Sequence, residues 1–332
     1  MRPGSTGSPT WTWITNDRIS VMNHKLESMD YPGHDEVGRG MVLIAGYRKA
    51  YLFFFFLFLI QMVTFTQPPA EGRPPDADRQ RPRREIKWVD PDIIEMPGLS
   101  HHVLQSEALG HEVGYVVWLP EEYARKAKKR YPVIYFLHGA GGTEASDGPG
   151  FAARVQQAMN DESLPPAICV FPNGGMSGYR GVVESMIIDE LIPTIDREYR
   201  TKTKPESRAL AGFSMGGAGS VYLAIMHPEL FCAAGSMGGG IHGRRGNDEH
   251  TNTMDQSIDK AIPVWKKNDF GFFMVNGDED RPDAFKEFAA KLDQAGIDYE
   301  LVVQPDTKHN LGLYYEGSAS RLLALLGRHL KK

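Results

Sequence analysis

The chain of 332 residues has few cysteines, no excess of basic residues and no internal repeat. Two cysteines, Cys169 and Cys232, cannot build a disulfide framework or a zinc site made of cysteines. They fall on predicted strands too far apart for a disulfide, so we expect buried free thiols. Lys and Arg number 37 against 42 Asp and Glu, a net charge of −5 that excludes a broad basic surface for nucleic acid. Hydrophobic residues make up 41% and charged residues 24%, which is the balance of a globular protein.

One apolar run, from Ala50 to about Phe65, follows Arg48 and Lys49. A basic start followed by about 7–15 apolar residues is typical of a secretory signal peptide, whereas a spanning helix needs about 20. No clear cleavage site follows the run. It therefore predicts a signal peptide or an N-terminal membrane anchor within residues 41–70, and export to the periplasm or the extracellular space.

The residues around this run predict the limits of the folded part. A signal peptide belongs at the start of a chain, so Met41 is the expected initiator. Residues 1–40 are polar and are interpreted as an extension that is not translated. Residues 71–90 are rich in Pro and Arg and predict a solvated linker. Residues 91–332 are then one large folded domain.

Strand-like and helix-like segments alternate along this domain. Continuous apolar runs are typical of strands buried on both faces, and the alternation predicts an α/β fold. We expect a mostly parallel eight-stranded sheet with helices on both faces. The Gly-rich, polar stretch 240–265 predicts a long loop or small insertion. The expected strands are Val103–Glu107, Val113–Leu119, Tyr131–Leu137, Ala167–Phe171, Arg208–Phe213, Phe231–Gly235, Phe270–Val275 and Glu300–Val303, and the expected helices are Val182–Tyr199, Ala218–Met226, Ala284–Ala295 and Ser318–Leu330.

The pattern Gly-x-Ser-x-Gly, centred on Ser214, lies between a predicted strand and a predicted helix. In that context it predicts a sharp turn that holds a nucleophilic serine in a strained backbone conformation. Gly212 and Gly216 let the chain pass close to itself there. The turn presents the hydroxyl at a helix N-terminus, where backbone N–H groups stabilise an anion.

A serine hydroxyl needs a base, and folds with this motif place the acid and then the histidine after the serine. His309, between the last strand and the last helix, is the predicted base. His242 and His250, in the polar stretch, are weaker candidates. We expect His227 to cap a helix and His329 to be solvated.

The predicted acid follows the penultimate strand. The spacing Gly277-x-x-Asp favours Asp280, with Asp278 as the second choice. Its role is to orient His309 and to stabilise the imidazolium.

An oxyanion hole needs two backbone donors. The N–H of Met215, the residue after the nucleophile, is the first. The small residues after the third strand predict the second, for which we choose Ala140, with Gly139 and Gly141 as close alternatives. His138 is expected to hold this loop rather than to act as a base.

Three segments together carry a resemblance: Pro132–Gly142, Asp189–Arg200 and Ala211–Gly217. They resemble the esterase D family, which includes S-formylglutathione hydrolases, tributyrin esterases, feruloyl and acetyl-xylan esterases and antigen 85-type acyltransferases. The resemblance covers roughly residues 95–330. It implies the α/β-hydrolase fold and carboxylic ester hydrolysis.

The resemblance also supports Asp280 and His309 by their positions. The chain departs from the family pattern beside the histidine. Thr307 and Lys308 precede His309 where family members often have a Gly-Gly pair, and Leu311, Tyr314 and Tyr315 follow it where they often have a tryptophan.

The leading hypothesis is an exported serine carboxylesterase that uses Ser214, His309 and Asp280 and needs no metal or organic cofactor. Its expected substrates are short-chain acyl esters or feruloyl and acetyl esters, either small or linked to polysaccharide. The alternatives are an acyltransferase of the antigen 85 type and a non-catalytic binding protein with the α/β-hydrolase fold. The sequence predicts no nucleic-acid partner, and a membrane contact only through an uncleaved anchor. It leaves the oligomeric state open.

Overall fold

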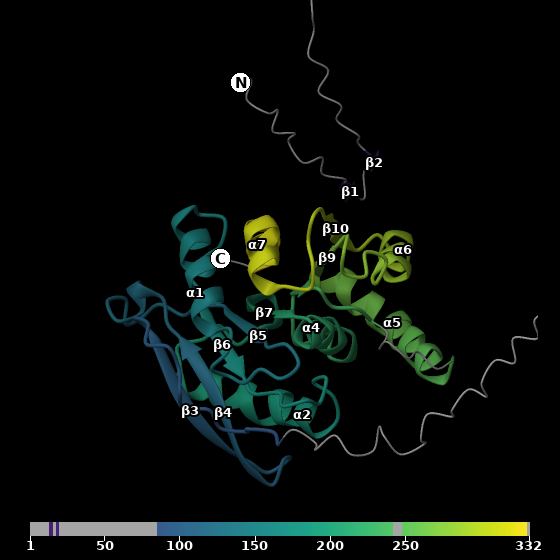
Figure 1. Ribbon diagram of the computed structural model, residues 1–332. Coiled ribbons are helices and arrows are strands. Elements are labelled where there is room, and N and C mark those ends of the chain that lie inside the picture. Colours follow the sequence, from purple (N-terminus) through teal and green to yellow (C-terminus); the bar gives the residue numbers. More distant parts are fainter. Residues whose placement is uncertain (1–12, 16–17, 20–84, 242–247, 331–332) are drawn as a thin grey trace, which may run out of the picture. The chain divides into compact units, whose positions relative to one another are not determined.

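The computed structural model describes residues 13–15, 18–19, 85–241 and 248–330 (Figure 1). The predicted signal or anchor, the initiator Met41 and most of the predicted linker lie outside the described residues. Residues 86–330 belong to one compact unit, which contains all the predicted site residues in the described part.

Among the described residues, ten strands form one sheet in the order β2-β1-β10-β9-β8-β7-β5-β6-β4-β3. Strands β10, β9, β8, β7, β5 and β6 run parallel, whereas β3 and β4 form an antiparallel hairpin that pairs with β6. Two short antiparallel strands continue the sheet beyond β10. The eight predicted strands and their mostly parallel arrangement are confirmed. The strands are β1 (Trp13–Thr15), β2 (Arg18–Ile19), β3 (Leu99–Ser106), β4 (His111–Trp118), β5 (Val133–Leu137), β6 (Ile168–Pro172), β7 (Arg208–Phe213), β8 (Ala233–Met237), β9 (Gly271–Gly277) and β10 (Asp298–Gln304).

Helices cover both faces of the sheet, as predicted (Figure 1). The helices α1 and α7 pack on one face, and the segment from α2 to α3 packs with α4, α5 and α6 on the other. The helices are α1 (Gly148–Asn160), α2 (Val182–Ser185), a π-helical turn η2 (Met186–Leu191), α3 (Ile192–Glu198), α4 (Met215–Met226), α5 (Asp248–Asn268), α6 (Lys286–Ala295) and α7 (Leu311–His329), with short 3-10 turns η1 (Glu121–Tyr123) and η3 (Pro205–Ser207).

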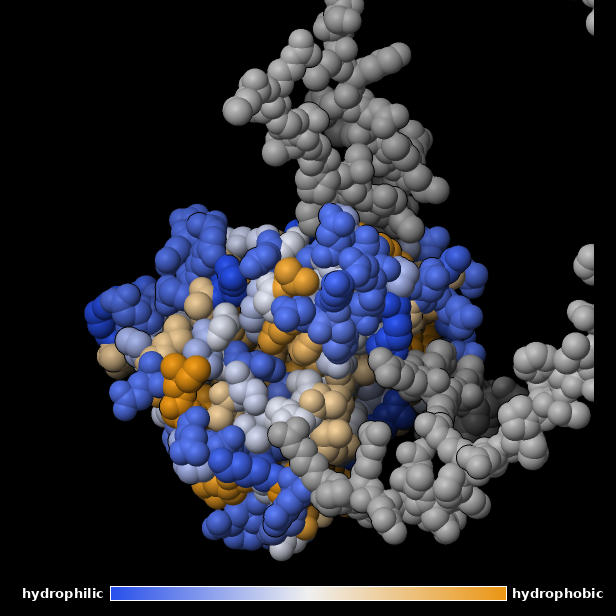
Figure 2. Space-filling view, in the orientation of Figure 1, coloured by the Kyte–Doolittle hydropathy of each residue, from blue (hydrophilic) through white to orange (hydrophobic). Residues whose placement is uncertain are grey.

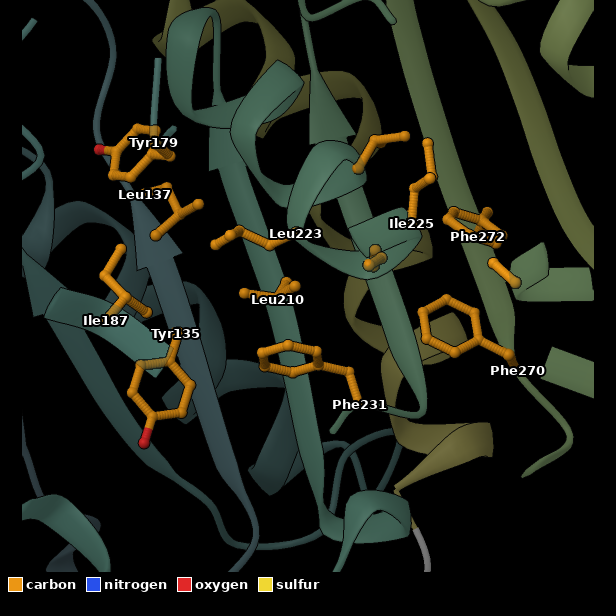
Figure 3. Close-up of a cluster of buried hydrophobic side chains, with 14 of the residues drawn as sticks. Tyr135, Leu137, Tyr179, Ile187, Leu210, Leu223, Ile225, Phe231, Phe270 and Phe272 are labelled. Atoms are coloured by element: carbon orange, nitrogen blue, oxygen red, sulfur yellow. The ribbon is translucent and has the colours of Figure 1, made fainter. Parts of the chain in front are cut away.

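The core divides into two layers because side chains of a strand alternate between its faces. Tyr135 and Leu137 of β5 belong to one layer, whereas Phe136 between them belongs to the other. Figure 3 shows part of the first layer, where Leu210 of β7 and Phe272 of β9 join them. Central strands buried on both faces therefore explain the continuous apolar runs in the sequence.

The prediction of a loop over 240–265 is wrong from residue 248 onward, where α5 begins. The buried residues Met254, Ile258, Ala261 and Trp265 recur every three or four positions and form the inner face of this helix. Polar residues between them hide the period in the sequence. Helix α1 was not predicted, because its first turn contains two glycines and a proline.

The remaining expectations concern the cysteines and the surface. Cys169 and Cys232 are buried and form no disulfide, as predicted. In the described part of the chain, no helix is long and apolar enough to cross a membrane. Figure 2 shows a mostly hydrophilic face with small apolar patches. Met176 and Val182 are among the most exposed of the large apolar side chains.

Candidate active site

Ser214 lies in the tight turn between β7 and α4. Its backbone has φ 55° and ψ −113°, a conformation that is strained for a residue with a side chain. A Cβ at Gly212 would lie 2.4 Å from the carbonyl oxygen of Gly216, and a Cβ at Gly216 would lie 1.9 Å from that of Leu137. These contacts explain why the turn needs glycine two positions before and after the serine.

The structure brings together the three side chains predicted to react or to assist. His309 Nε2 lies 2.7 Å from Ser214 Oγ, and His309 Nδ1 lies 2.6 Å from Asp280 Oδ2. A carboxylate can only accept a hydrogen bond, so the imidazole proton is on Nδ1 and Nε2 is free to accept from the serine. The Asp280 side chain is 7% exposed and that of His309 is 44% exposed, so the acid is buried while the base faces the solvent.

The second candidate acid, Asp278, is not brought to His309. Its two carboxylate oxygens accept hydrogen bonds from the backbone N–H groups of Asp306 and Thr307, at 3.1 and 3.0 Å. These hydrogen bonds lower the pKa of Asp278 below its ordinary value. Asp278 therefore fastens the loop that carries His309 to the end of β9.

Tyr314 contacts the same acid and was not predicted from the sequence. Its hydroxyl donates to Asp280 Oδ2 at 2.6 Å and accepts from the backbone N–H of Gly277 at 2.8 Å. Burial, and then the hydrogen bond to Asp280, raises the pKa of Tyr314, so the phenol keeps its proton. In the sequence, only the position of Tyr314 in the helix that follows His309 could have pointed to this contact.

The loop after β5 forms a turn beside Ser214. The N–H of Gly142 donates to the carbonyl oxygen of Gly139 at 3.0 Å, and Gly141 has φ 83°, as position three of a type II turn requires. A Cβ on Gly139 would lie 3.4 Å from Ser214 Cβ, so the turn reaches the nucleophile.

The N–H groups of this turn have different partners. Gly141 donates to Met176 Sδ at 3.1 Å, and Gly139 donates to the carboxyl of Asp147. Among the hydrogen bonds of the described residues, the N–H groups of Ala140 and Met215 have no acceptor. The two predicted donors are therefore the ones that remain available beside the serine.

His138 connects this turn with the loop after β6. Its Nε2 accepts from the N–H of Gly174 at 2.9 Å, so its proton is on Nδ1, which lies 2.8 Å from the carbonyl oxygen of Gly139. Burial lowers the pKa of His138 and keeps the imidazole neutral. It is 2% exposed and contacts loop backbone rather than the serine, as predicted for a residue that holds the loop.

The other histidines lie elsewhere. His227 ends α4 as expected and contacts Glu184, with 2.8 Å between Nε2 and Oε1. The prediction that His329 is solvated is wrong, because it is buried against Asp298 and the carbonyl oxygen of Asp269. His242 lies outside the described residues, as does the side chain of His250. The described residues contain no group of three His, Cys, Asp or Glu side chains placed to hold a metal ion.

Comparison with known families and proteins gives consistent matches. The family model described as "Putative esterase" matches residues 106–284, more than half of the chain. The endo-1,4-beta-xylanase/feruloyl esterase of Xylanibacter ruminicola is 30% identical over 220 residues, which are 61% of this chain and 28% of that protein. Esterase Rv1288 of Mycobacterium tuberculosis is 34% identical over 160 residues, 45% of this chain and 34% of that protein. The chain thus spans about a third of the length of these curated relatives.

A solved structure shows the same fold. The ferulic acid esterase AmCE1/Fae1A of Anaeromyces mucronatus aligns with a TM-score of 0.57 and 20% identity, and the alignment covers 74% of this chain and 99% of that one. The predicted α/β-hydrolase fold is confirmed.

Proposed function

Because the chain belongs to the esterase family described as "Putative esterase" and has the α/β-hydrolase fold, we propose that it is a serine carboxylesterase. The observation that carries the proposal is the continuous hydrogen-bonded series from Ser214 through His309 to Asp280. A hydrolase of this kind requires that arrangement, whereas a binding protein does not.

In the proposed reaction, Ser214 Oγ attacks the ester carbonyl carbon while His309 Nε2 accepts the serine proton. Asp280 stabilises the imidazolium that forms and keeps the ring in the tautomer that can accept. His309 then returns the proton to the leaving alcohol, which leaves an acyl group on Ser214. A water molecule, deprotonated by the same histidine, releases the acid and restores the serine.

The negative charge that develops on the carbonyl oxygen is stabilised by the N–H groups of Ala140 and Met215. The support for Ala140 is elimination, since the N–H groups of Gly139, Gly141 and Gly142 have other acceptors. The support for Met215 as the other donor is that it is the first residue of α4, where a backbone N–H has no partner within the helix.

For the substrate, we propose feruloyl esters, including those linked to polysaccharide. The support is the name of the Xylanibacter ruminicola relative, whose similarity includes 61% of this chain. Ferulic acid released from methyl ferulate or from feruloylated arabinoxylan, measured by chromatography, tests this choice against acetyl esters.

We also propose that the protein is exported. The support is the apolar run after Arg48 and Lys49 in the sequence. Cell fractionation, with N-terminal sequencing of the purified product, tests both export and cleavage. Recovery of the full chain in the cytoplasm would refute the proposal.

The decisive test of the esterase proposal uses the full chain and a fluorophosphonate probe, which labels an activated serine. We expect labelling and hydrolysis of p-nitrophenyl acetate by the native protein and neither by Ser214→Ala. Ser320→Ala, which removes an exposed hydroxyl on α7, is the matched control and should keep both. Equal activity in Ser214→Ala and the native protein would reject the proposed nucleophile.

A further inference from the structure

The anchor segment, residues 86–90, is distinct from the predicted membrane anchor within residues 41–70. It lies before the region that the family model matches and contacts two loops, the first of which reaches Ser214. These loops are the oxyanion loop, residues 138–144, and the β6 loop, residues 173–179. We propose that the anchor segment positions the oxyanion loop for ester hydrolysis, with Asp90 as its main positioning residue. This inference rests on the proposed esterase function.

The anchor segment first fixes the β6 loop. The side-chain amide of Asn173 donates to the carbonyl oxygen of Lys87 at 2.8 Å. Trp88 packs on Gly175, where a Cβ would lie 2.7 Å from the indole ring. The β6 loop then carries Met176, whose sulfur accepts from the oxyanion loop at Gly141. One route of contacts thus runs from the anchor segment to the turn beside the serine.

A second route is direct and runs through Asp90. Its carboxylate oxygen Oδ2 accepts from the Thr143 hydroxyl at 2.8 Å, while Oδ1 pairs with the Lys87 ammonium. Its backbone N–H donates to Glu144 Oε1 at 2.5 Å. Thr143 and Glu144 directly follow the turn that contains Ala140, so Asp90 fixes the end of the oxyanion loop at two points.

Glu144 makes this attachment rigid. Its side chain is 0% exposed, and a buried carboxylate is costly unless hydrogen bonds satisfy it. Besides Asp90 it contacts Asn173 Nδ2 at 2.6 Å and His101 Nε2 at 3.0 Å. A Cβ on Gly114 would lie 1.8 Å from Glu144 Oε1, so β4 leaves room for the carboxylate only at a glycine. The carboxylate cannot shift without losing partners from three segments.

The attachment of the oxyanion loop to the anchor segment matters because of the turn that contains Ala140. Ala140 supplies an N–H that acts on the substrate oxygen only when it points at the forming oxyanion. Small displacements of a donor weaken transition-state stabilisation more than substrate binding. Loosening the anchor segment should therefore lower kcat and leave KM nearly unchanged, whereas a general loss of folded protein would lower the amount of active enzyme and the melting temperature.

The test uses full-chain variants on both sides of one hydrogen bond. We expect Asp90→Ala and Thr143→Val each to lower kcat about 10-fold, with KM within two-fold of the native value. The double variant should lose much less than the product of the two single losses, because both substitutions remove the same hydrogen bond. Thr143→Ser keeps the hydroxyl and should keep the activity. Asp92→Ala is the matched control, since its side chain is 88% exposed and it contacts neither loop.

A second readout separates positioning from stability. A trifluoromethyl ketone forms a tetrahedral oxyanion on the serine, so its inhibition constant should rise by about the factor by which kcat/KM falls. Unchanged kcat in Asp90→Ala and Thr143→Val would overturn the inference, as would losses that follow the melting temperature. If the native protein neither hydrolyses esters nor reacts with a fluorophosphonate probe, the proposed function itself fails, and the inference fails with it.

Discussion

Tyr314 and His309 bind the same oxygen of Asp280, each at 2.6 Å. The phenol donates to Oδ2 from α7, and the imidazole contacts it through Nδ1 from the loop before that helix. Since one carboxylate oxygen serves both, its charge is shared between the base and a neutral donor. Tyr314 therefore helps to hold the carboxylate oxygen that contacts His309.

We expect Tyr314→Phe to lower kcat by up to about 10-fold. The variant removes the hydroxyl that donates to Asp280 Oδ2, so the carboxylate oxygen that contacts His309 loses one of its two hydrogen bonds. The exposed pair of Glu279 and Lys308 remains unchanged. Steady-state kinetics of ester hydrolysis measure the loss.

The adjacent residue supplies the control for this prediction. Tyr315 is also buried, but its hydroxyl has no hydrogen-bond partner among the described residues. Tyr315→Phe removes the same atom without touching Asp280 and should leave kcat unchanged. A native kcat in Tyr314→Phe would show that sharing of the carboxylate oxygen has no effect on the reaction.

Matched substitutions of Asp280 and Asp278 distinguish which of the two aspartates acts as the acid beside His309. Asp280→Asn should lower kcat by about 10³ to 10⁴-fold, because an amide N–H facing Nδ1 holds the imidazole in the wrong tautomer. Asp278→Asn should cost less than about 10-fold, since that side chain accepts backbone N–H groups and does not contact the imidazole. Steady-state kinetics on the two purified variants decide the matter. The reverse order of losses would assign the acid to Asp278.

Asp147, next to the oxyanion loop, should make stability depend on pH. Burial raises the pKa of its carboxyl from 3.8 to about 6. The folded state therefore holds this proton more tightly than the unfolded state does. The contribution of the bound proton to the stability of the fold is complete below about pH 3.8 and is lost as the pH rises through 6. Asp147→Asn should thus raise the free energy of unfolding by about 2 kcal/mol at pH 8 and by less than about 1 kcal/mol at pH 4.

Urea unfolding at the two pH values measures this difference. The control is Asp161→Asn at the other end of α1, where the carboxyl is exposed. An equal gain for Asp147→Asn at pH 4 and pH 8 would show that its ionisation does not oppose folding.

The sequence predicted most of the sheet because strands buried on both faces are continuous apolar runs. It predicted the turn at Ser214 because close backbone contacts there require glycine at two fixed positions. Helix α5 escaped prediction because its buried face, from Met254 to Trp265, is a narrow stripe in a polar segment. A strand or helix can therefore be predicted from its apolar pattern when most residues of the segment follow that pattern.

Contacts between distant segments are harder to predict. Tyr314 meets Asp280 across 34 positions, and Asp90 meets Thr143 across 53. Neither pair has a spacing that a local pattern encodes, since the fold alone brings β9, α7 and the anchor segment to the same end of the sheet. Beyond the place of Tyr314 in the helix after His309, no pattern in the sequence therefore indicated these contacts.

The close contact between Gly216 and Leu137 leads to a final prediction about the two oxyanion donors. Gly216 follows Met215 at the start of α4, and Leu137 ends β5 just before the turn that contains Ala140. A Cβ at Gly216 would lie 1.9 Å from the carbonyl oxygen of Leu137 and 2.7 Å from that of His138. Because both obstacles are backbone atoms, Gly216→Ala must push the helix away from the strand.

We expect Gly216→Ala to lower the free energy of unfolding by about 3 kcal/mol and kcat by more than about 100-fold. The matched control is Gly150→Ala in α1, where the nearest atom would be a ring carbon of Tyr315 at 3.3 Å and a small shift makes room. Urea unfolding and ester hydrolysis at low temperature, where the variant stays folded, measure both effects. A folded Gly216→Ala protein with native kcat would mean that the spacing of the two N–H groups does not limit the reaction, and it would argue against assigning both of them to the oxyanion.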